Sequence, residues 1–397
     1  MTLRLAIDGG TPVRRTMLPY GRQSIDEQDV AAVVEVLRSD WLTTGPKVAQ
    51  FEAALAAVAG TAQAVAVSSG TAALHAVMAG LGVSPGDEVI VPALTFAATA
   101  NAVVYQGGTP LFADVDPATL LIDPGSVAER ITPRTRAVTA VDYAGQPCDY
   151  GRLRPLAAEH GLALVADACH AIGGRWRDLP VGSLAAASAM SFHPVKHVTT
   201  GEGGAVTTDD AELARRMRTF RNHGISTDFR QRAARDSWQY EMVELGFNYR
   251  LSDLQCALGI SQLAKLPSSI ARRQAIARRY DAALAAVPAV EPLAVRPDCS
   301  HAYHLYVVRL ELELLRVDRG AVFRALRAEG IGVNVHYIPV HLHPYYREKF
   351  GTAAGLCPVA EAAYQRILSL PIFPAMTDAD ADDVLEALRK VVENYSR

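Results

Sequence analysis

An alternation of short apolar stretches with helical stretches constrains the fold of this chain most strongly. Each predicted strand contains a short continuous apolar run, and these segments occupy residues 64–70, 87–92, 109–116, 136–145 and 162–173. Strands that are apolar on both faces are typical of a parallel sheet covered by helices on each side. The sequence therefore predicts an α/β fold, whose functional groups lie beyond the carboxyl ends of the strands.

The helices near the N-terminus and within the alternation have recognisable boundaries. Ser24 and Glu27 have the spacing of a capping box, which predicts that the first helix begins there. Residues 95–107 are predicted to form one of the helices between two strands. A terminal helix is expected from about Thr377.

The character of the sequence changes beyond residue 250. Two long helices are predicted at 251–266 and 268–287, followed by mixed strands and helices. This change predicts a large α/β domain over residues 1–255 and a smaller C-terminal α+β domain over residues 256–397.

Composition argues against several classes of protein. The 397 residues carry a formal net charge of −3 without a basic stripe, which disfavours a nucleic-acid partner. No apolar stretch approaches the roughly 20 residues of a membrane span, and the N-terminus lacks a signal-peptide core, so a cytoplasmic protein is expected. The five cysteines are scattered and odd in number, which argues against a disulfide framework and a cysteine zinc site.

Three polar segments follow predicted strands and therefore meet at one edge of the sheet. Ser69, Gly70 and Thr71 begin a helix, where free N–H groups favour an anion such as phosphate, although ordinary capping explains them equally well. Asp167 ends the apolar run "LALVAD", and a carboxylate there is costly unless it is paired or functional. Lys196 follows another short strand, close to Ser191.

A phosphate cradle, an aspartate and a lysine at one edge are the groups that pyridoxal phosphate requires. Taken alone, Lys196 has the features of an ordinary surface lysine, so the prediction depends on the combination. Phe96, in "TFAATAN", has the character either of a ring that stacks on the cofactor or of a core residue.

Four ordered motifs extend this interpretation over nearly all of the chain. They are "SSGTAALHAVMAGLGVSPGDEVIVPALTFAATANAV", "DACHAIG", "SFHPVKHVTTGEGG" and "GFNYRLSDLQCALG". Together they resemble the DegT/DnrJ/EryC1/StrS family of pyridoxal-phosphate-dependent sugar aminotransferases. The resemblance implies the aspartate aminotransferase fold (type I) and a homodimer.

The resemblance also implies roles for individual residues. Lys196 matches the lysine that forms the Schiff base, Asp167 the partner of the pyridinium nitrogen, and Phe96 the stacked aromatic ring. His170 stands where the family has glutamine or histidine near the phenolic oxygen. The residues that match phosphate binders are Ser69, Gly70, Thr71, Ser191 and, from the other subunit of the dimer, Asn248.

The form "HPVKH-TTGEGG" is most similar to the branch that acts on UDP-linked 4-keto-6-deoxy-N-acetylhexosamines, as in the pseudaminic acid pathway, with glutamate as amine donor. Candidate substrate residues, each open to a capping or packing role instead, are Thr43, Thr44, Arg250, His336, Tyr337 and His341. No acidic or cysteine ligand accompanies the histidines at metal-ligand spacing, so no metal site is predicted.

Several alternatives stay open. The substrate could be a dTDP- or GDP-linked keto-sugar or a cyclitol. A dehydratase branch of the family carries histidine in place of the lysine, and Lys196 favours transamination over that chemistry. A binding protein without catalytic activity is a third possibility, which the joint presence of Lys196, Asp167 and Ser191 disfavours.

Overall fold

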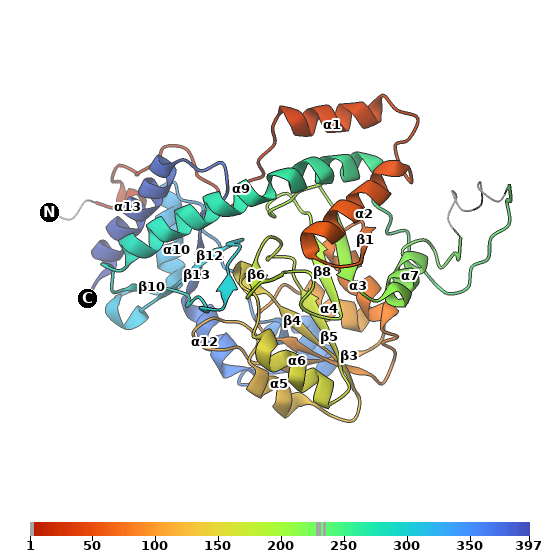
Figure 1. Ribbon diagram of the computed structural model, residues 1–397. Coiled ribbons are helices and arrows are strands. Elements are labelled where there is room, and N and C mark those ends of the chain that lie inside the picture. Colours follow the sequence, from red (N-terminus) through yellow and green to blue (C-terminus); the bar gives the residue numbers. More distant parts are fainter. Residues whose placement is uncertain (1–3, 228–231, 233–235) are drawn as a thin grey trace.

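The structure is a computed structural model that describes residues 4–227, 232 and 236–397. Its centre is a sheet of seven strands in the order β1-β9-β8-β5-β4-β2-β3 (Figure 1). In that order the strands are Gln63–Val67, Gly204–Thr208, Ala187–Ser191, Ala163–Asp167, Thr135–Val141, Glu88–Pro92 and Thr109–Ala113. Only β9 runs antiparallel to its neighbours in this sheet, which confirms the predicted, mostly parallel α/β fold.

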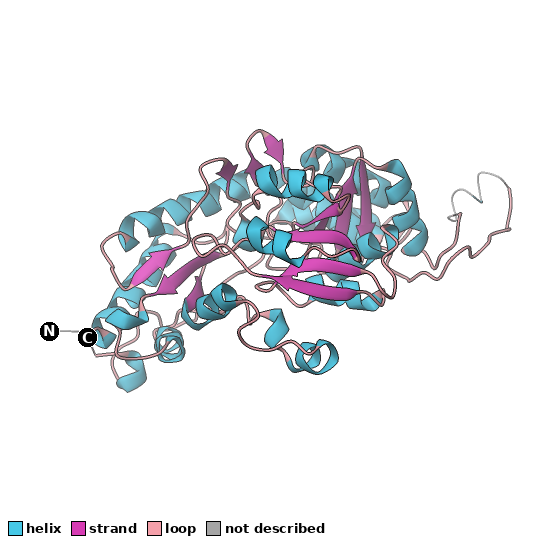
Figure 2. Cartoon of the chain, turned by 90° about the horizontal axis from the view of Figure 1, so that it is seen from below, coloured by secondary structure: helices cyan, strands magenta, loops and turns pink. Residues whose placement is uncertain are grey.

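Helices cover both faces of this sheet, as Figure 2 shows. They are α2 (Pro46–Ala59), α3 (Gly70–Gly80), α4 (Ala98–Tyr105), α5 (Pro124–Arg130), α6 (Tyr150–Glu159) and α7 (Ala211–Phe220). Every residue of β2 is buried, as expected for a strand covered on both sides. The helix predicted over 95–107 is shorter, because it begins at Ala98 and leaves Phe96 in the preceding loop.

One helix, α9 (Asp253–Leu284), replaces the two long helices predicted at 251–266 and 268–287. That prediction was wrong because Pro267 lies inside the helix without ending it. A proline removes one helical hydrogen bond, but α9 packs against α1 and α2 along one part and against α13 along another. These tertiary contacts offset the local cost, and α9 connects the two halves of the molecule (Figure 1).

The first helix, α1 (Glu27–Leu37), begins with a different capping box from the predicted one. Asp26 is the N-cap, and Asp29 completes the box in place of Ser24 and Glu27. Asp29 is buried where α1 packs on α9, and it also accepts a hydrogen bond from Gln262 of α9 at 2.8 Å. Tertiary pairing with α9 therefore selects the boundary of this helix.

The smaller half of the molecule has its own antiparallel sheet, in the order β10-β12-β13. These strands are Val290–Pro292, Tyr306–Leu310 and Ile367–Leu370, and the accompanying helices are α10 (Arg319–Ala328), α11 (Pro344–Phe350), α12 (Pro358–Arg366) and α13 (Asp378–Tyr395). As predicted, Thr377 caps the terminal helix. A third small sheet contains β11 (Cys299–Ser300), β6 (Arg175–Trp176) and β7 (Leu179–Pro180).

The buried apolar residues form two clusters that meet along α9. Leu266 belongs to the cluster around the large sheet, whereas Ile276 belongs to the cluster of the smaller half. Leu5 and Leu18, from the N-terminus, also belong to the second cluster. The division of the chain after residue 255 stays a prediction. Among the described residues, no helix combines the length and apolar character needed to cross a membrane.

Candidate active site

The start of α3 and the end of β8 form the first part of the site. Ser69 caps α3, since its Oγ accepts a hydrogen bond from the Ala72 N–H at 3.0 Å. Gly70 permits a close approach, because a Cβ at this position would lie 2.8 Å from the Cβ of Ser191. The unpaired N–H groups of this first helical turn, which includes Thr71, therefore lie beside the Ser191 hydroxyl and favour an anion.

Asp167 occupies the end of β5 and is buried. One carboxylate oxygen accepts a hydrogen bond from the Thr99 hydroxyl at 2.7 Å, and the other accepts one from the Cys169 N–H at 3.3 Å. The Thr99 hydroxyl is itself bonded to that of Thr95 at 2.8 Å. This chain of hydrogen bonds holds the carboxylate in one orientation. Thr99 was not predicted, and only its place three residues after Phe96 in the same motif hinted at it.

Lys196 lies in the turn after β8, where its N–H donates to the His193 carbonyl at 2.9 Å. Its amine is 3.4 Å from Nε2 of His304. Burial lowers the pKa of this amine, while nearby Cys169 and Asp167 oppose that shift. A lysine with a lowered pKa presents more uncharged amine, which is the nucleophilic form.

Histidine and aromatic side chains form the wall around this lysine. His170 is buried, and its Nε2 pairs with the Tyr337 hydroxyl at 3.1 Å. Burial, with Lys196 nearby, lowers the pKa of His170 well below its usual range. Phe96 has a ring centroid 5.9 Å from that of Tyr337 and is 58% exposed. Such exposure argues against core packing and leaves the ring face free to stack.

The loop with Thr43 and Thr44 is attached to the start of α9. Thr43 forms a backbone bridge with Ser252, and the Gly45 N–H donates to the buried carboxylate of Asp253 at 2.6 Å. A Cβ at Gly45 would lie 2.5 Å from an Asp253 oxygen, so this tight attachment requires glycine. The loop therefore presents Thr43, which is exposed, and Thr44, which is half-buried, from a rigid base.

The remaining predicted substrate residues divide into two groups. His336 is buried, with Nδ1 paired to the Ser369 hydroxyl at 2.8 Å, and burial together with Lys196 lowers its pKa to about 4. His341 instead contacts Glu361 at 2.9 Å, beside Phe112 of the edge strand β3. The structure brings His336 and Tyr337 toward Lys196 but gives His341 a packing role elsewhere.

An arm projects from the body after α7 (Figure 1), and its described residues are 221–227, 232 and 236–247. Asn248 and Arg250 follow it in the chain. Arg250 donates to the Asn222 side chain at 2.9 Å, and Asn248 pairs with the backbone of Asn222 while its side chain is exposed. Next to them, the Tyr249 carbonyl accepts from the Ser68 N–H at 2.8 Å, directly before α3. The base of the arm is thus attached to the anion-binding edge.

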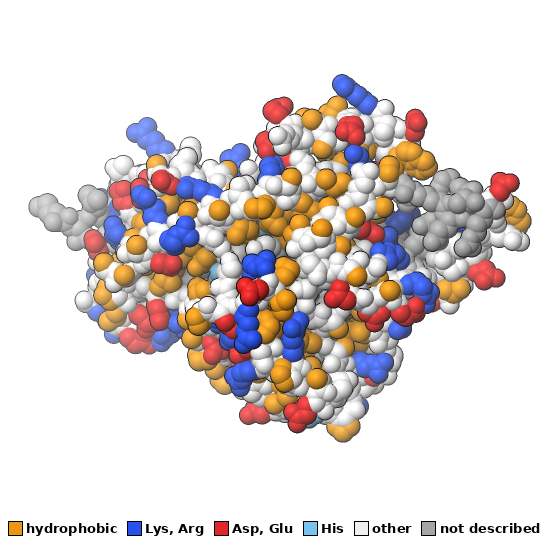
Figure 3. All heavy atoms as spheres, in the orientation of Figure 1, with side chains coloured by type: hydrophobic (Ala, Val, Ile, Leu, Met, Phe, Trp, Pro, Cys, Tyr) orange, Lys and Arg blue, Asp and Glu red, His pale blue; other side chains and the backbone are white. Residues whose placement is uncertain are grey.

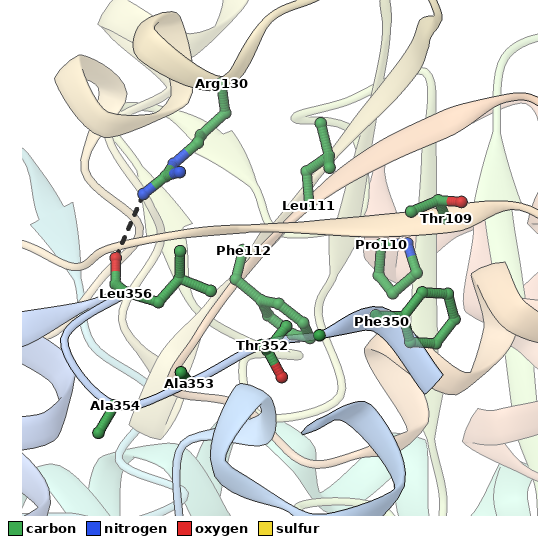
Figure 4. A pocket seen from close by; sticks show the side chains of 11 residues that line it. Thr109, Pro110, Leu111, Phe112, Arg130, Phe350, Thr352, Ala353, Ala354 and Leu356 are labelled. Atoms are coloured by element: carbon green, nitrogen blue, oxygen red, sulfur yellow. Dashed lines mark hydrogen bonds between the residues drawn. The ribbon is translucent and has the colours of Figure 1, made fainter. Parts of the chain in front are cut away.

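The structure has a cavity beside Lys196 and another away from the predicted site. A cavity of about 270 Å³ lies beside Lys196 and His197, and its wall carries the cations Arg22, Lys265 and Arg272. Figure 4 shows another, of about 400 Å³, between the edge strand β3 and residues 350–356. None of the predicted site residues lines this second cavity.

The DegT/DnrJ/EryC1/StrS aminotransferase family matches residues 23–389. The chain belongs to this family. It is 43% identical over 382 residues to the spore coat polysaccharide biosynthesis protein SpsC of Bacillus subtilis, covering 96% of this chain and 98% of that protein. The family and its structural neighbours are PLP-dependent sugar aminotransferases, and this chain is therefore such an enzyme.

Solved structures agree with this assignment. The PLP form of Spr1654 from Streptococcus pneumoniae is 32% identical with a TM-score of 0.89, covering 95% of this aminotransferase and 99% of that chain, and Spr1654 is also known in a PMP form. PseC of Helicobacter pylori, an aminotransferase involved in pseudaminic acid biosynthesis, is 32% identical with a TM-score of 0.89, covering 96% and 100%.

The residues of the aminotransferase site fit pyridoxal phosphate. The close approach at Gly70 forms an anion cradle, the buried carboxylate of Asp167 suits a protonated ring nitrogen, and Phe96 offers an exposed ring. The buried Nδ1 of His170 has no hydrogen-bond partner within the described residues. A polar atom left unpaired beside a lysine is consistent with a site that receives a polar ligand.

Proposed function

We propose that this aminotransferase transfers an amino group from glutamate to the 4-keto carbon of a UDP-linked 6-deoxy-4-keto-N-acetylhexosamine. The observation that carries the transamination is the meeting of Lys196, Asp167 and the α3 cradle at one edge of the sheet. The sugar is supported by similarity to PseC over 96% of this chain and by the motif "HPVKH". A cytoplasmic location stays part of this proposal.

Lys196 would hold the cofactor, and its amine is proposed to move protons at the amine-bearing carbon of glutamate and of the sugar. Its lowered pKa suits both tasks, because an uncharged amine is needed first as nucleophile and then as base. When bound, the cofactor supplies an electron sink through its ring. Asp167 is proposed to keep the ring nitrogen protonated, with Thr99 orienting the carboxylate.

The phosphate is proposed to lie at the N-terminus of α3, held by N–H groups of Gly70 and Thr71 and by the hydroxyls of Ser69 and Ser191. Ser69 already caps Ala72, so its hydroxyl hydrogen remains available to donate. Phe96 would cover one face of the ring. Tyr337 would orient the His170 side chain through its Nε2. The buried Nδ1 of His170, which has no partner within the described part of the chain, would face the cofactor ring.

A cation near Lys196 supports a phosphorylated substrate. Arg22 lines the cavity beside Lys196 and makes no hydrogen bond or ion pair with any described residue, whereas Lys265 is paired with Asp26 at 2.8 Å. Arginine binds phosphate oxygens through two parallel hydrogen bonds. We propose that Arg22 contacts the diphosphate, so Arg22→Ala should raise KM for the nucleotide-sugar while leaving KM for glutamate unchanged.

The homodimer is proposed because the arm exposes apolar side chains. Trp238 is 84% exposed, Leu245 79% and Met242 66%, and Figure 3 shows further apolar atoms over α1 and α9. Surfaces of this kind are typical of protein interfaces. A partner subunit covering the arm would bring Asn248 toward the partner's phosphate site, with Thr43, Thr44 and His336 left to contact the sugar.

Two experiments test the proposal. An absorbance spectrum of the purified protein should show a cofactor band that moves to shorter wavelength when glutamate is added. Incubation with UDP-, dTDP- and GDP-linked 4-keto sugars should then yield an amino sugar, detected by mass spectrometry, only or fastest with the UDP substrate. Faster reaction with a dTDP-, GDP-linked or cyclitol ketone would replace the proposed substrate, and loss of water without amine transfer would indicate a dehydratase. A band that never responds to glutamate would support a binding protein.

A further inference from the structure

His304 lies beside the amine of Lys196, although it belongs to a distant part of the sequence. It is in the loop before β12, it is 6% exposed, and its Nε2 is 3.4 Å from the lysine nitrogen. Main-chain hydrogen bonds fix this loop: the buried Arg273 donates to the His304 carbonyl at 3.4 Å, and the Leu305 N–H donates to the Ala144 carbonyl at 3.1 Å. The backbone of His304 is therefore held independently of its ring.

The ring itself is packed between two other histidines. Its centroid is 4.4 Å from that of His170 and 5.7 Å from that of His197. The His197 ring is in turn held by its Nε2, which contacts the Ala302 carbonyl at 2.9 Å. Rotation of the His304 ring would displace these neighbours, so Nε2 stays directed at the amine.

The charges around this pair favour a neutral imidazole. Burial lowers the pKa of His304 well below its usual range, and Lys196 and the neighbouring histidines lower it further. A neutral histidine has one ring nitrogen that donates and one that accepts. The charged and titratable groups that act on the pKa of Lys196 or of His304 are Asp167, Cys169, His170, His197 and Arg273. His336 also lies near enough for Lys196 to lower its pKa.

We propose that His304 is a positioning residue for Lys196: its Nε2 accepts a hydrogen bond from the amine, and its Nδ1, which has no hydrogen-bond partner among the described residues, carries the ring hydrogen. An uncharged amine held in this way donates one hydrogen to His304 and keeps its lone pair free to take a proton. The orientation of the base is thus provided by a residue from the smaller half of the molecule. The inference rests on the proposed role of Lys196 as that base.

The test compares two variants of His304. His304→Gln keeps a side-chain oxygen that accepts a hydrogen bond, whereas His304→Leu fills similar space without an acceptor; His304→Met replaces the latter if it does not fold. The first readout is the pKa of Lys196 in the cofactor-free protein, measured by competitive labelling across pH with mass spectrometry. We expect this pKa to fall in His304→Leu, since an acceptor stabilises the ammonium, and to stay near wild type in His304→Gln.

The second readout is the rate at which bound cofactor is converted by glutamate, followed by absorbance. It should fall by up to roughly tenfold in His304→Leu, the size of one hydrogen bond between uncharged groups, and much less in His304→Gln. Equal losses in both variants would mean that only the shape of the ring matters and would overturn the proposal. An unchanged or raised Lys196 pKa in His304→Leu would overturn it as well. If the wild-type protein fails with glutamate, the proposed function fails, but the labelling still decides whether the hydrogen bond exists.

Discussion

The surroundings of Lys196 and the arm after α7 are built on opposite principles. Around Lys196, which is half-buried, Asp167 and His304 are buried; Asp167 is hydrogen-bonded to Thr99, and His304 contacts the lysine amine. On the arm, Trp238 and Leu245 are largely exposed, and backbone bridges such as Ile225 with Met242 hold its described residues together. The chain by itself thus packs the groups around Lys196 and leaves apolar surface exposed on the arm.

This difference indicates where the free energy of each region comes from. A buried polar network is stable only when its members are paired, so the centre has to be preorganised within the folded chain. Exposed aromatic and aliphatic side chains gain free energy only when another surface covers them. The catalytic centre should therefore respond to mutation through rate, and the arm through association.

The largest effect is expected at the centre of the buried region. Lys196→Ala should abolish turnover, because the variant lacks the amine proposed to hold the cofactor and to move protons. Product formation under steady-state conditions is the measurement, with Lys349→Ala, an exposed lysine of α11, as the matched control. Steady multiple turnover by Lys196→Ala would show that another group carries the chemistry.

The second-largest loss of activity is expected for a substitution of Asp167. Asp167→Ala should lower kcat by about 10²–10⁴-fold, the range typical of losing a group that controls a proton. Single-turnover absorbance with glutamate measures this loss apart from product release. Near-normal rates would mean that a different acid faces the ring nitrogen. The control is Asp178→Ala, at an exposed aspartate away from the site.

Variants of the arm should change the association of subunits before they change the catalytic rate, unlike variants near Lys196. Leu245→Asp should weaken the dimer roughly a hundredfold, since a carboxylate would be buried without a partner in the proposed interface. Sedimentation at several protein concentrations measures the dissociation constant. Val295→Asp, on an apolar residue that is 45% exposed outside the arm, should leave the dimer intact. A dimer unaffected by Leu245→Asp would place the interface elsewhere.

A smaller effect is expected at Thr99. Thr99→Val removes the hydroxyl that donates to Asp167 at 2.7 Å but keeps the shape of the side chain. The rate of the glutamate reaction should fall about tenfold, as expected for one hydrogen bond to a charged group, while Thr99→Ser should restore most of it. If serine and valine behave alike, the hydroxyl does not orient the carboxylate.

The smallest effect is one on stability rather than rate. Burial lowers the pKa of His301 to about 3. At a pH between the pKa of His301 in the unfolded chain and its pKa in the native chain, the unfolded chain binds a proton and the native chain does not. The free energy of unfolding therefore falls as the pH falls. Between about pH 6.5 and about pH 5, His301 should lower the free energy of unfolding by about 2 kcal/mol.

Urea unfolding at these two pH values checks this prediction. His301→Asn, which keeps an acceptor for the Tyr303 N–H now paired at 2.8 Å, should lose that part of the pH dependence. His160→Gln, at an exposed histidine, should retain it. The same pH dependence in all three proteins would show that His301 is not the source.

The structure places predicted site residues close together where they follow strands, whereas contacts between distant segments were not predicted. Gly70, Asp167 and Ser191 could be placed together, because the ends of parallel strands lie at one edge of a sheet. Thr99 and His304 were missed, since neither lies at a strand end and their neighbours become apparent only in three dimensions. His341 was proposed for the substrate, but the fold places it against Glu361.

The fold shows the same division. The continuous apolar strands determined the parallel sheet, because their residues have to be covered on both faces whatever else the chain does. The extent of α9 through Pro267 and the capping of α1 by Asp26 depended on packing between separate elements. Local propensity is a weak contribution compared with such contacts.

The sequence by itself therefore determined the sheet, the cofactor edge and the chemical types of its residues, since each depends on local pattern and spacing. Only the tertiary structure decided which side chains contact Lys196 and Asp167, and which apolar residues stay exposed on the arm. The physical reason is that burial and hydrogen bonding between distant segments are properties of the packed chain, and no local pattern of residues encodes them.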